Sequence, residues 1–189
     1  MVAGAGYAAW RFPRAAADKR EGDSCKEIEP GDDDASEGRC AADGKSLLAC
    51  REGRMARQAC RGARGCVQSG RAAHCDQSIA REGDGCQLGS ACAEGGGALL
   101  RCVKGEQILA QTCRGSRGCQ VAGERVSCDS TLAKTGDPCL DEGTGACRDD
   151  RAAVLICRGA RYAELRPCPG EAPCGGDQHE FSCRVEKRQ

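Results

Sequence analysis

Cysteine is the residue whose type and spacing carry the most chemistry in this chain. The 189 residues include 18 cysteines, an even number, as a fully paired disulfide framework requires. Structural zinc sites typically use pairs of cysteines with two to four residues between them, whereas the closest cysteines here have five residues between them. Haem attachment and thioredoxin-like redox chemistry are excluded because no Cys-x-x-Cys motif occurs. We therefore expect every cysteine to be in a disulfide, with the pairing left open.

Arginine is the second residue type whose placement points to chemistry. Two short loops have the sequence Cys-Arg-Gly-x-Arg-Gly-Cys. A guanidinium group held in such a loop can bind a carboxylate, sulfate or phosphate through a fork of two parallel hydrogen bonds. The alternative is a solvated loop in which the glycines supply turn conformations. The candidate anion-binding residues are Arg61, Arg64, Arg114 and Arg117.

Residues suited to catalysis or to metal binding are sparse. His74 and His179 are the two histidines, the residue type whose pKa suits a base at neutral pH. Neither histidine stands in a recognisable Ser/His/Asp catalytic-triad pattern, and no Gly-x-Ser-x-Gly motif is present. The run Asp32-Asp33-Asp34 offers oxygen ligands but lacks the spacing of a calcium-binding loop. We expect no catalytic residue, no metal site, no cofactor and no enzymatic activity.

The cysteines fall into three sets of six with recurring spacing. The gap from the second to the third cysteine is 10 residues in every set, and the last two gaps are 6 and 9. The first gap varies, at 15, 6 and 8 residues, so the first loop is the region expected to diverge in function. The expected disulfide cysteines are Cys25, Cys40, Cys50, Cys60, Cys66 and Cys75; Cys86, Cys92, Cys102, Cys113, Cys119 and Cys128; and Cys139, Cys147, Cys157, Cys168, Cys174 and Cys183.

Other residues repeat in register with the cysteines. Each set begins with Gly-Asp-x-Cys, and the Cys-Arg-Gly loop of the first two sets becomes Cys-Pro-Gly in the third. This periodicity predicts three tandem modules over 22–81, 82–134 and 135–189, with boundaries near 79–82 and 132–135. The sets are separated by 11 residues, which favours limited flexibility between modules.

Short apolar runs around glycine turns predict the elements that position these residues. In the second module, 98–102 and 107–112 flank a turn at Gly105, and 120–128 contains a second turn at Gly123. The third module keeps the first hairpin, with a turn at 158–160. Helical periodicity is not apparent. The predicted fold class is small, disulfide-rich and mainly β, with each module built from short hairpins and loops.

Composition limits the core, the compartment and the partners. Aromatic residues make up 3% of the chain, too few for modules of this size to fold on apolar burial alone. Disulfides persist in oxidising compartments, which predicts a secreted or cell-surface protein. The 28 basic and 28 acidic side chains are interspersed, which argues against nucleic acid and against a polybasic membrane anchor. No Asn is present, so N-linked glycosylation is excluded.

Residues 1–21 read as a leader. The apolar stretch 2–10 is too short to span a bilayer, and no positive region precedes it. We interpret it as the end of a truncated signal or anchor segment, the alternative being an unstructured Ala-rich leader. Membrane contact is expected only through this end.

Part of each module resembles a known family. The stretch with Cys102-Val-Lys-Gly, Cys113-Arg-Gly and Cys128-Asp129 resembles the peritrophin-A type chitin-binding domain, which implies chitin binding. The 10-residue second gap and the Cys-x5-Cys pair depart from that family, and only Tyr162 and Phe181 remain as aromatic residues in the modules. The Gly-Asp-x-Cys starts also resemble uncharacterised cysteine-rich repeat proteins of myxobacteria-like bacteria, which implies no activity.

These observations predict a non-enzymatic, extracytoplasmic structural or adhesive repeat protein that binds an extracellular polysaccharide or a protein. One alternative is a carbohydrate-binding (chitin-like) module. The other is a secreted inhibitor or toxin-like factor, since stapled loops suit rigid presentation of a binding surface.

Overall fold

Strands supply all the regular secondary structure in the part of the chain that the computed structural model describes. These residues are 19–25, 38–69, 72–86, 89–123, 125–170, 172–176 and 180–183. No helix occurs among them, and none could therefore cross a membrane. The leader up to residue 18, the acidic run 32–34 and His179 lie outside the described residues. The prediction of a small, disulfide-rich, mainly β fold is confirmed.

Each cysteine set encloses one small sheet and one hairpin. We refer to residues 19–75 as block 1, 79–128 as block 2 and 132–183 as block 3. The sheet of block 1 has the order β1-β2-β3, and those of blocks 2 and 3 have the orders β6-β7-β8-β9 and β12-β13-β14-β15. The strands of block 1 are β1 (Arg39–Cys40), β2 (Ser46–Arg51), β3 (Arg54–Ala59), β4 (Cys66–Ser69) and β5 (Ala72–Cys75).

The corresponding elements recur in the other two blocks. Block 2 contains β6 (Ile79–Ala80), β7 (Ser90–Ala93), β8 (Ala98–Val103), β9 (Glu106–Thr112), β10 (Cys119–Ala122) and β11 (Arg125–Cys128). Block 3 contains β12 (Leu132–Ala133), β13 (Gly145–Arg148), β14 (Ala153–Arg158), β15 (Arg161–Pro167), β16 (Cys174–Gly176) and β17 (Phe181–Cys183). The separate hairpins are β4-β5, β10-β11 and β16-β17.

The central hairpins form where the apolar runs and glycine turns predict them. In block 2, β8 pairs with β9 and the two-residue turn is Lys104 and Gly105, with φ values of 50° and 86°. Two successive positive φ values match the twist of the flanking strands, which is why such turns favour glycine. Blocks 1 and 3 close their hairpins with the same kind of turn, one residue of each pair being glycine. The second hairpin of block 2, β10-β11, is also where the sequence predicts it.

Nine disulfides pair all 18 cysteines, and each set pairs within itself. In all three sets the first cysteine bonds the third, the second bonds the fifth and the fourth bonds the sixth. The 1–3 bond joins the start of the block to the central hairpin. The 2–5 bond joins the sheet to the second hairpin, and the 4–6 bond closes that hairpin onto the end of the preceding strand. The prediction that every cysteine is disulfide-bonded is confirmed.

The apolar core of each block is small and includes its cystines. In block 2 it is built from Ala80, Ala91 and Leu100. In block 3 it holds Leu155 and the single buried aromatic ring of that cluster, Tyr162, together with Ala133, Ala146, Cys139 and Cys157. Three cross-links of about 3 kcal/mol each compensate for such limited burial by restricting the unfolded chain.

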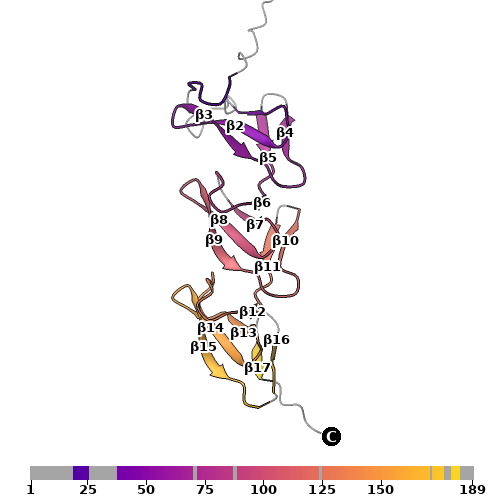
Figure 1. Cartoon of the computed structure of the whole chain (residues 1–189), viewed down its shortest axis with the longest axis vertical. Helices are drawn as coiled ribbons and strands as arrows, with labels where there is room; N and C mark the ends of the chain where they lie inside the picture. Colours follow the sequence, from indigo (N-terminus) through magenta and orange to yellow (C-terminus); the bar gives the residue numbers. More distant parts are fainter. Residues whose placement is uncertain are drawn as a thin grey trace, which may run out of the picture.

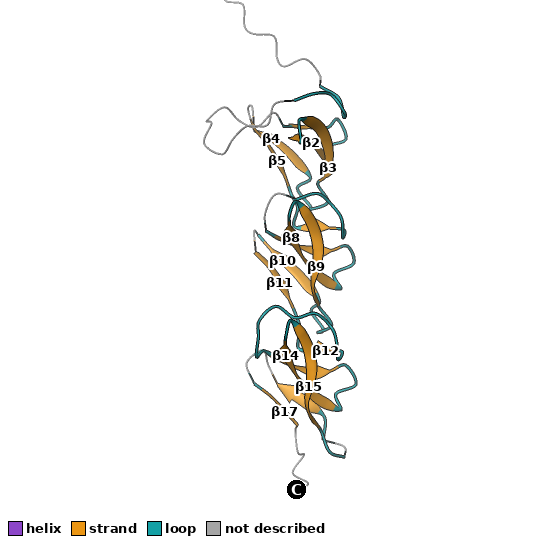
Figure 2. Ribbon diagram, turned by 90° about the vertical axis from the view of Figure 1, so that its left-hand side faces the viewer, coloured by secondary structure: helices purple, strands orange, loops and turns teal. Residues whose placement is uncertain are grey.

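The three blocks stack end to end into an elongated molecule (Figures 1 and 2). Strands β6 and β12 occupy the predicted boundary segments, and each pairs in parallel with the next strand of its own block, β7 or β13. The connection between blocks is thereby reduced to residues 76–78 and 129–131. Nine disulfides indicate an oxidising, extracytoplasmic environment for this assembly.

Candidate functional site

The most distinctive polar contacts in the molecule lie at the two junctions between blocks. At the first junction, the Cys-Arg-Gly loop of block 1 meets the Gly-Asp-x-Cys turn of block 2. Arg61 donates from Nε to Asp84 Oδ2 at 2.7 Å and from Nη2 to Asp84 Oδ1 at 3.3 Å. Its Nη1 also donates to Glu94 Oε1 at 3.2 Å. We call this set of contacts the first clasp.

The second junction repeats the same fork one block further along the chain. Arg114 donates from Nε to Asp137 Oδ2 at 2.6 Å and from Nη2 to Asp137 Oδ1 at 3.2 Å. The side chain of Arg114 is 34% exposed and that of Asp137 is 13% exposed, so the pair is partly shielded from solvent. Two parallel hydrogen bonds between a guanidinium and a carboxylate fix orientation as well as distance. We call this pair the second clasp.

Both clasp aspartates also hold their own turn. Asp84 accepts a hydrogen bond from the backbone N–H of Arg81, and Asp137 accepts one from that of Lys134, each at 2.8 Å. Burial opposes ionisation of these two carboxyl groups, but the hydrogen bonds from the arginine and from the backbone outweigh it. The pKa of each carboxyl group is therefore lowered from its ordinary value.

A second pair of aspartates anchors the connecting residues. Asp129 is 6% exposed and accepts hydrogen bonds from the backbone N–H groups of Arg117 and Thr131, at 3.2 and 3.1 Å. Its carboxylate lies against Gly115, where a Cβ atom would stand 2.1 Å from Asp129 Cγ. The carboxylate of Asp76 lies against Gly62 in the same way and accepts hydrogen bonds from the backbone N–H groups of Arg64 and Ser78. The glycine of Cys-Arg-Gly is thus required by close approach of this carboxylate.

The backbone of the connecting residues is fixed at both ends. Gly115 N–H donates to Asp129 O, and Asp129 N–H donates to Gly118 O, which ties the connection to block 2. Cys147 N–H then donates to Thr131 O at 2.9 Å, which ties it to block 3. The first junction has the same three hydrogen bonds, made by residues 62, 65, 76, 78 and 92.

The two junctions differ in how Gln58 and its counterpart Gln111 are packed, although a pocket of about 460 Å³ also borders Arg61 and Glu94 at the first junction. At the first, Arg51 of block 1 donates to Gln58 Oε1 at 3.2 Å and to the carbonyl of Cys86 at 3.1 Å. Gln77 donates to the carbonyl of Gly85 at 2.7 Å. The second junction has Val103 in place of Arg51 and Ser130 in place of Gln77.

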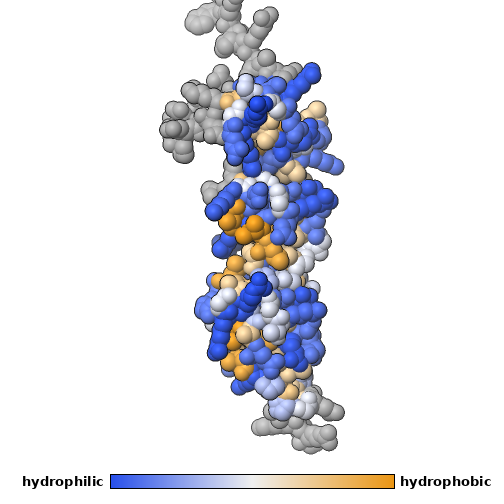
Figure 3. All heavy atoms as spheres, turned by 60° about the vertical axis from the view of Figure 1, so that its left-hand side comes forward, coloured by the Kyte–Doolittle hydropathy of each residue, from blue (hydrophilic) through white to orange (hydrophobic). Residues whose placement is uncertain are grey.

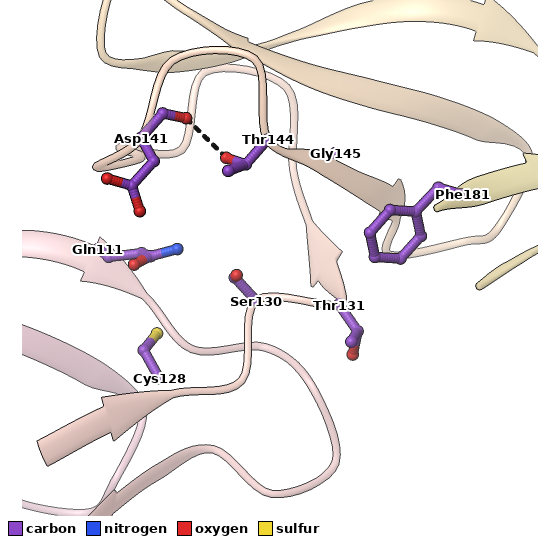
Figure 4. A pocket seen from close by; sticks show the side chains of 8 residues that line it. All are labelled: Gln111, Cys128, Ser130, Thr131, Asp141, Thr144, Gly145 and Phe181. Carbon is purple, nitrogen blue, oxygen red and sulfur yellow. Dashed lines mark hydrogen bonds between the residues drawn. The ribbon is translucent and has the colours of Figure 1, made fainter. Parts of the chain in front are cut away.

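Ser130 lines a pocket of about 270 Å³ at the second junction. Figure 4 shows Gln111, Ser130 and Asp141 around its polar end, and the ring of Phe181 at its other end. Gln111 is the counterpart of Gln58, two residues before the fourth cysteine of its set. The pocket lining comprises Gln111, Cys128, Ser130, Thr131, Asp141, Thr144, Gly145 and Phe181.

The structure brings each predicted anion-binding arginine onto a carboxylate of the chain itself. Arg61 and Arg114 form the clasps. Arg64 and Arg117 lie 3.4 Å from Asp76 and Asp129 through Nε, with side chains 67% and 60% exposed. Binding of an external anion stays a prediction, and these ion pairs would compete with it.

Of the other sequence candidates, His74 borders a pocket of about 410 Å³ together with Arg64, Val67 and Asp76. His74 is exposed on β5. Among the described residues, no group of three or more His, Cys, Asp or Glu side chains could hold a metal ion.

Sequence reasoning missed the partners of Arg61 and Arg114, as well as Gln111. One signal was available for the partners: Gly-Asp-x-Cys is present in the second and third sets, each preceded by a set that carries Cys-Arg-Gly. No comparable signal marked Gln111.

Comparison with known proteins finds no matching family model, no matching curated protein and no matching solved structure. The two resemblances drawn from the sequence therefore stay predictions.

Proposed function

We propose that the chain is a stiff, non-enzymatic structural or adhesive protein that works outside the cytoplasm, secreted or at the cell surface. In this proposal its three blocks are repeats held in line, so that the chain sets a fixed distance and displays a binding surface for a polysaccharide or a protein. The observation that carries the proposal is the pair of clasps, because the same fork recurs at both junctions.

The junction geometry supports stiffness. Residues 76–78 and 129–131 are too few to act as a flexible tether, and their backbone groups are hydrogen-bonded to the blocks on both sides. The clasps add a side-chain contact between blocks at each junction. Rotation of one block against the next would break all of these contacts together.

The third block departs from the pattern in a way that fits this role. Its fourth cysteine is followed by Pro169 and Gly170 instead of Arg and Gly. Proline cannot supply the fork, so block 3 receives a clasp through Asp137 but cannot offer one of the same kind. The repeated arginine therefore lies at both junctions within this chain, where it meets an aspartate of the next block.

An adhesive role is supported by apolar side chains left exposed on a charged surface. Ile108 and Leu109 on β9 and Leu165 on β15 are 42%, 40% and 48% exposed. On the face shown in Figure 3, apolar residues form patches over the second and third blocks. Exposed apolar area of this kind is typical of binding surfaces.

Nuclear magnetic relaxation of the oxidised chain tests the stiffness directly. A stiff molecule gives all three blocks one elongated rotational diffusion tensor, whereas loosely tethered blocks tumble with separate tensors. We expect one tensor for the wild type and separate tensors after Arg61→Ala combined with Arg114→Ala. The matched control, Arg64→Ala with Arg117→Ala, removes the same charge and should keep one tensor. Separate tensors in the wild type would overturn the proposal.

A further inference from the structure

Gln111 is a mostly buried residue whose amide end reaches a pocket. The residue is 9% exposed, and its side chain makes no hydrogen bond to any described residue. The amide opens onto the pocket at the second junction, facing Ser130 and Asp141 in Figure 4. Neither polar atom of the amide is fully enclosed, so water reaches it, and a ligand in the pocket can take the place of that water.

The first junction shows how the same position is satisfied when no ligand is needed. Gln58 is 4% exposed, and its Oε1 accepts a hydrogen bond from Arg51. Gln77 reaches across to the carbonyl of Gly85. The chain can therefore close a junction with its own side chains, and it does not do so at Gln111.

The pocket offers neutral hydrogen-bonding groups beside an aromatic ring. The amide of Gln111 can donate and accept at once, and Ser130 supplies a hydroxyl group. The Thr144 hydroxyl donates to Asp141 O at 2.7 Å and can still accept a hydrogen bond. No Lys, Arg or His lines the pocket, and the one charged group is the exposed Asp141 carboxylate. An anionic ligand would be repelled, whereas a ligand with several hydroxyl groups would be matched.

Phe181 supplies the apolar end of the pocket. The ring is half-buried and packs over Gly145, where a Cβ atom would stand 2.8 Å from Phe181 Cδ2. Pyranose sugars combine a ring of hydroxyl groups with an apolar C–H face. One end of the pocket suits the hydroxyl groups, and the other suits the C–H face.

We propose that this pocket binds one neutral sugar residue of a polysaccharide. The inference deepens the proposed adhesive function and rests on it, because the walls of the pocket come from two blocks that the second clasp holds together. The volume of about 270 Å³ lies just below the usual range for small-molecule sites, which suits one sugar ring with the rest of the polymer outside.

The test is a titration of the isotope-labelled, oxidised full chain, followed by its amide resonances. The probes are methyl β-glucoside, methyl β-galactoside and methyl β-N-acetylglucosaminide, with glucuronate and N-acetyl-lysine amide as charged comparisons. We expect at least one neutral glycoside to shift the side-chain NH₂ resonances of Gln111, with weak, about millimolar, affinity for a single sugar. Glucuronate should shift them less at equal concentration.

Two variants and a control place the binding in the pocket. Gln111→Leu keeps the bulk of the side chain and should weaken binding about tenfold or more. Ser130→Gln copies the first junction and should abolish binding by filling the pocket. Gln58→Leu removes the equivalent amide at the first junction and should leave the affinity unchanged. Amide spectra of all three variants establish that each is folded.

Three results would overturn the inference. The first is no shift of Gln111 with any neutral glycoside. The second is a response to N-acetyl-lysine amide in the absence of a response to sugars. The third is sugar binding that Ser130→Gln leaves intact. Nuclear magnetic relaxation of the same samples reports the stiffness independently. A single rotational diffusion tensor without sugar binding would contradict this inference alone. Separate tensors for the three blocks would contradict the proposed function itself.

Discussion

Removing the fork at the second clasp should weaken the fold by a measurable amount. Arg114→Met keeps most of the side-chain stem and deletes the guanidinium group that donates to Asp137 at 2.6 and 3.2 Å. Exposed ion pairs contribute about 0–1 kcal/mol, whereas hydrogen bonds to charged groups contribute about 1.5–3 kcal/mol. Since the second clasp is only partly shielded, we expect a coupling energy between Arg114 and Asp137 of about 1–2 kcal/mol.

A double-mutant cycle isolates that energy. The free energy of unfolding is measured by calorimetry on oxidised wild type, Arg114→Met, Asp137→Asn and the double variant. The second substitution is nearly isosteric and leaves an oxygen to accept from the Lys134 amide, so the cycle reports chiefly on the ion pair.

Arg117→Met is the matched control for this cycle. Its guanidinium group is 60% exposed and makes one ionic contact at 3.4 Å, so the free energy of unfolding should change by less than about 0.5 kcal/mol. A coupling energy below about 0.3 kcal/mol, or an equal loss in Arg117→Met, would refute the reasoning that the fork joins the blocks.

Three further predictions concern pH, close packing and a buried amide. The pKa of Asp84 and of Asp137 is lowered in the folded state, so their contribution to stability is complete above the ordinary carboxyl value of about 3.9 and is lost as the pH falls through the lower folded values. The melting temperature of the double variant Arg61→Met with Arg114→Met should therefore fall less steeply in acid than that of the wild type. Parallel curves for the two proteins would contradict this. Gly115→Ala should destabilise the fold by about 2 kcal/mol or more, since its Cβ would overlap the Asp129 carboxylate, and an unchanged calorimetric melt would contradict this. Gln107→Met should raise stability by about 1 kcal/mol, because Gln107 is 1% exposed with no hydrogen-bond partner for Oε1, and a lower melting temperature in the variant would count against it.

Much of the fold could be predicted because its signals are local. The hairpin of β8 and β9 follows from two apolar runs around Gly105, and the turn needs the positive φ that glycine adopts readily. The disulfide pairing could not be predicted, because spacing along the chain does not say which cysteines meet in space. Strands β6 and β12 are only two residues long, too short for a periodicity to reveal, so sequence analysis treated them as boundary segments.

The candidate site was harder to predict from the sequence, because spacing along the chain does not say which residues meet in space. Arg61 and Arg114 stand out by their repetition, but repetition does not distinguish an external anion from a carboxylate of the chain as their partner. The partners Asp84 and Asp137 lie 23 residues further along the chain, in the Gly-Asp-x-Cys motif. Because this motif starts every cysteine set, its repetition indicates a structural role but no particular partner. Gln111 is one of several polar residues in an ordinary strand, and only the absence of a partner in three dimensions marks it.

Small-angle X-ray scattering of the oxidised chain at neutral pH tests the central claim most directly. We expect a distance distribution of an elongated rod for the wild type, with a maximum dimension at least that of the stacked blocks. We also expect a broader distribution with a shorter mean dimension for Arg61→Ala combined with Arg114→Ala, and no change for Arg64→Ala combined with Arg117→Ala. A wild-type curve that requires an ensemble of bent arrangements, or clasp variants that scatter like the wild type, would contradict it.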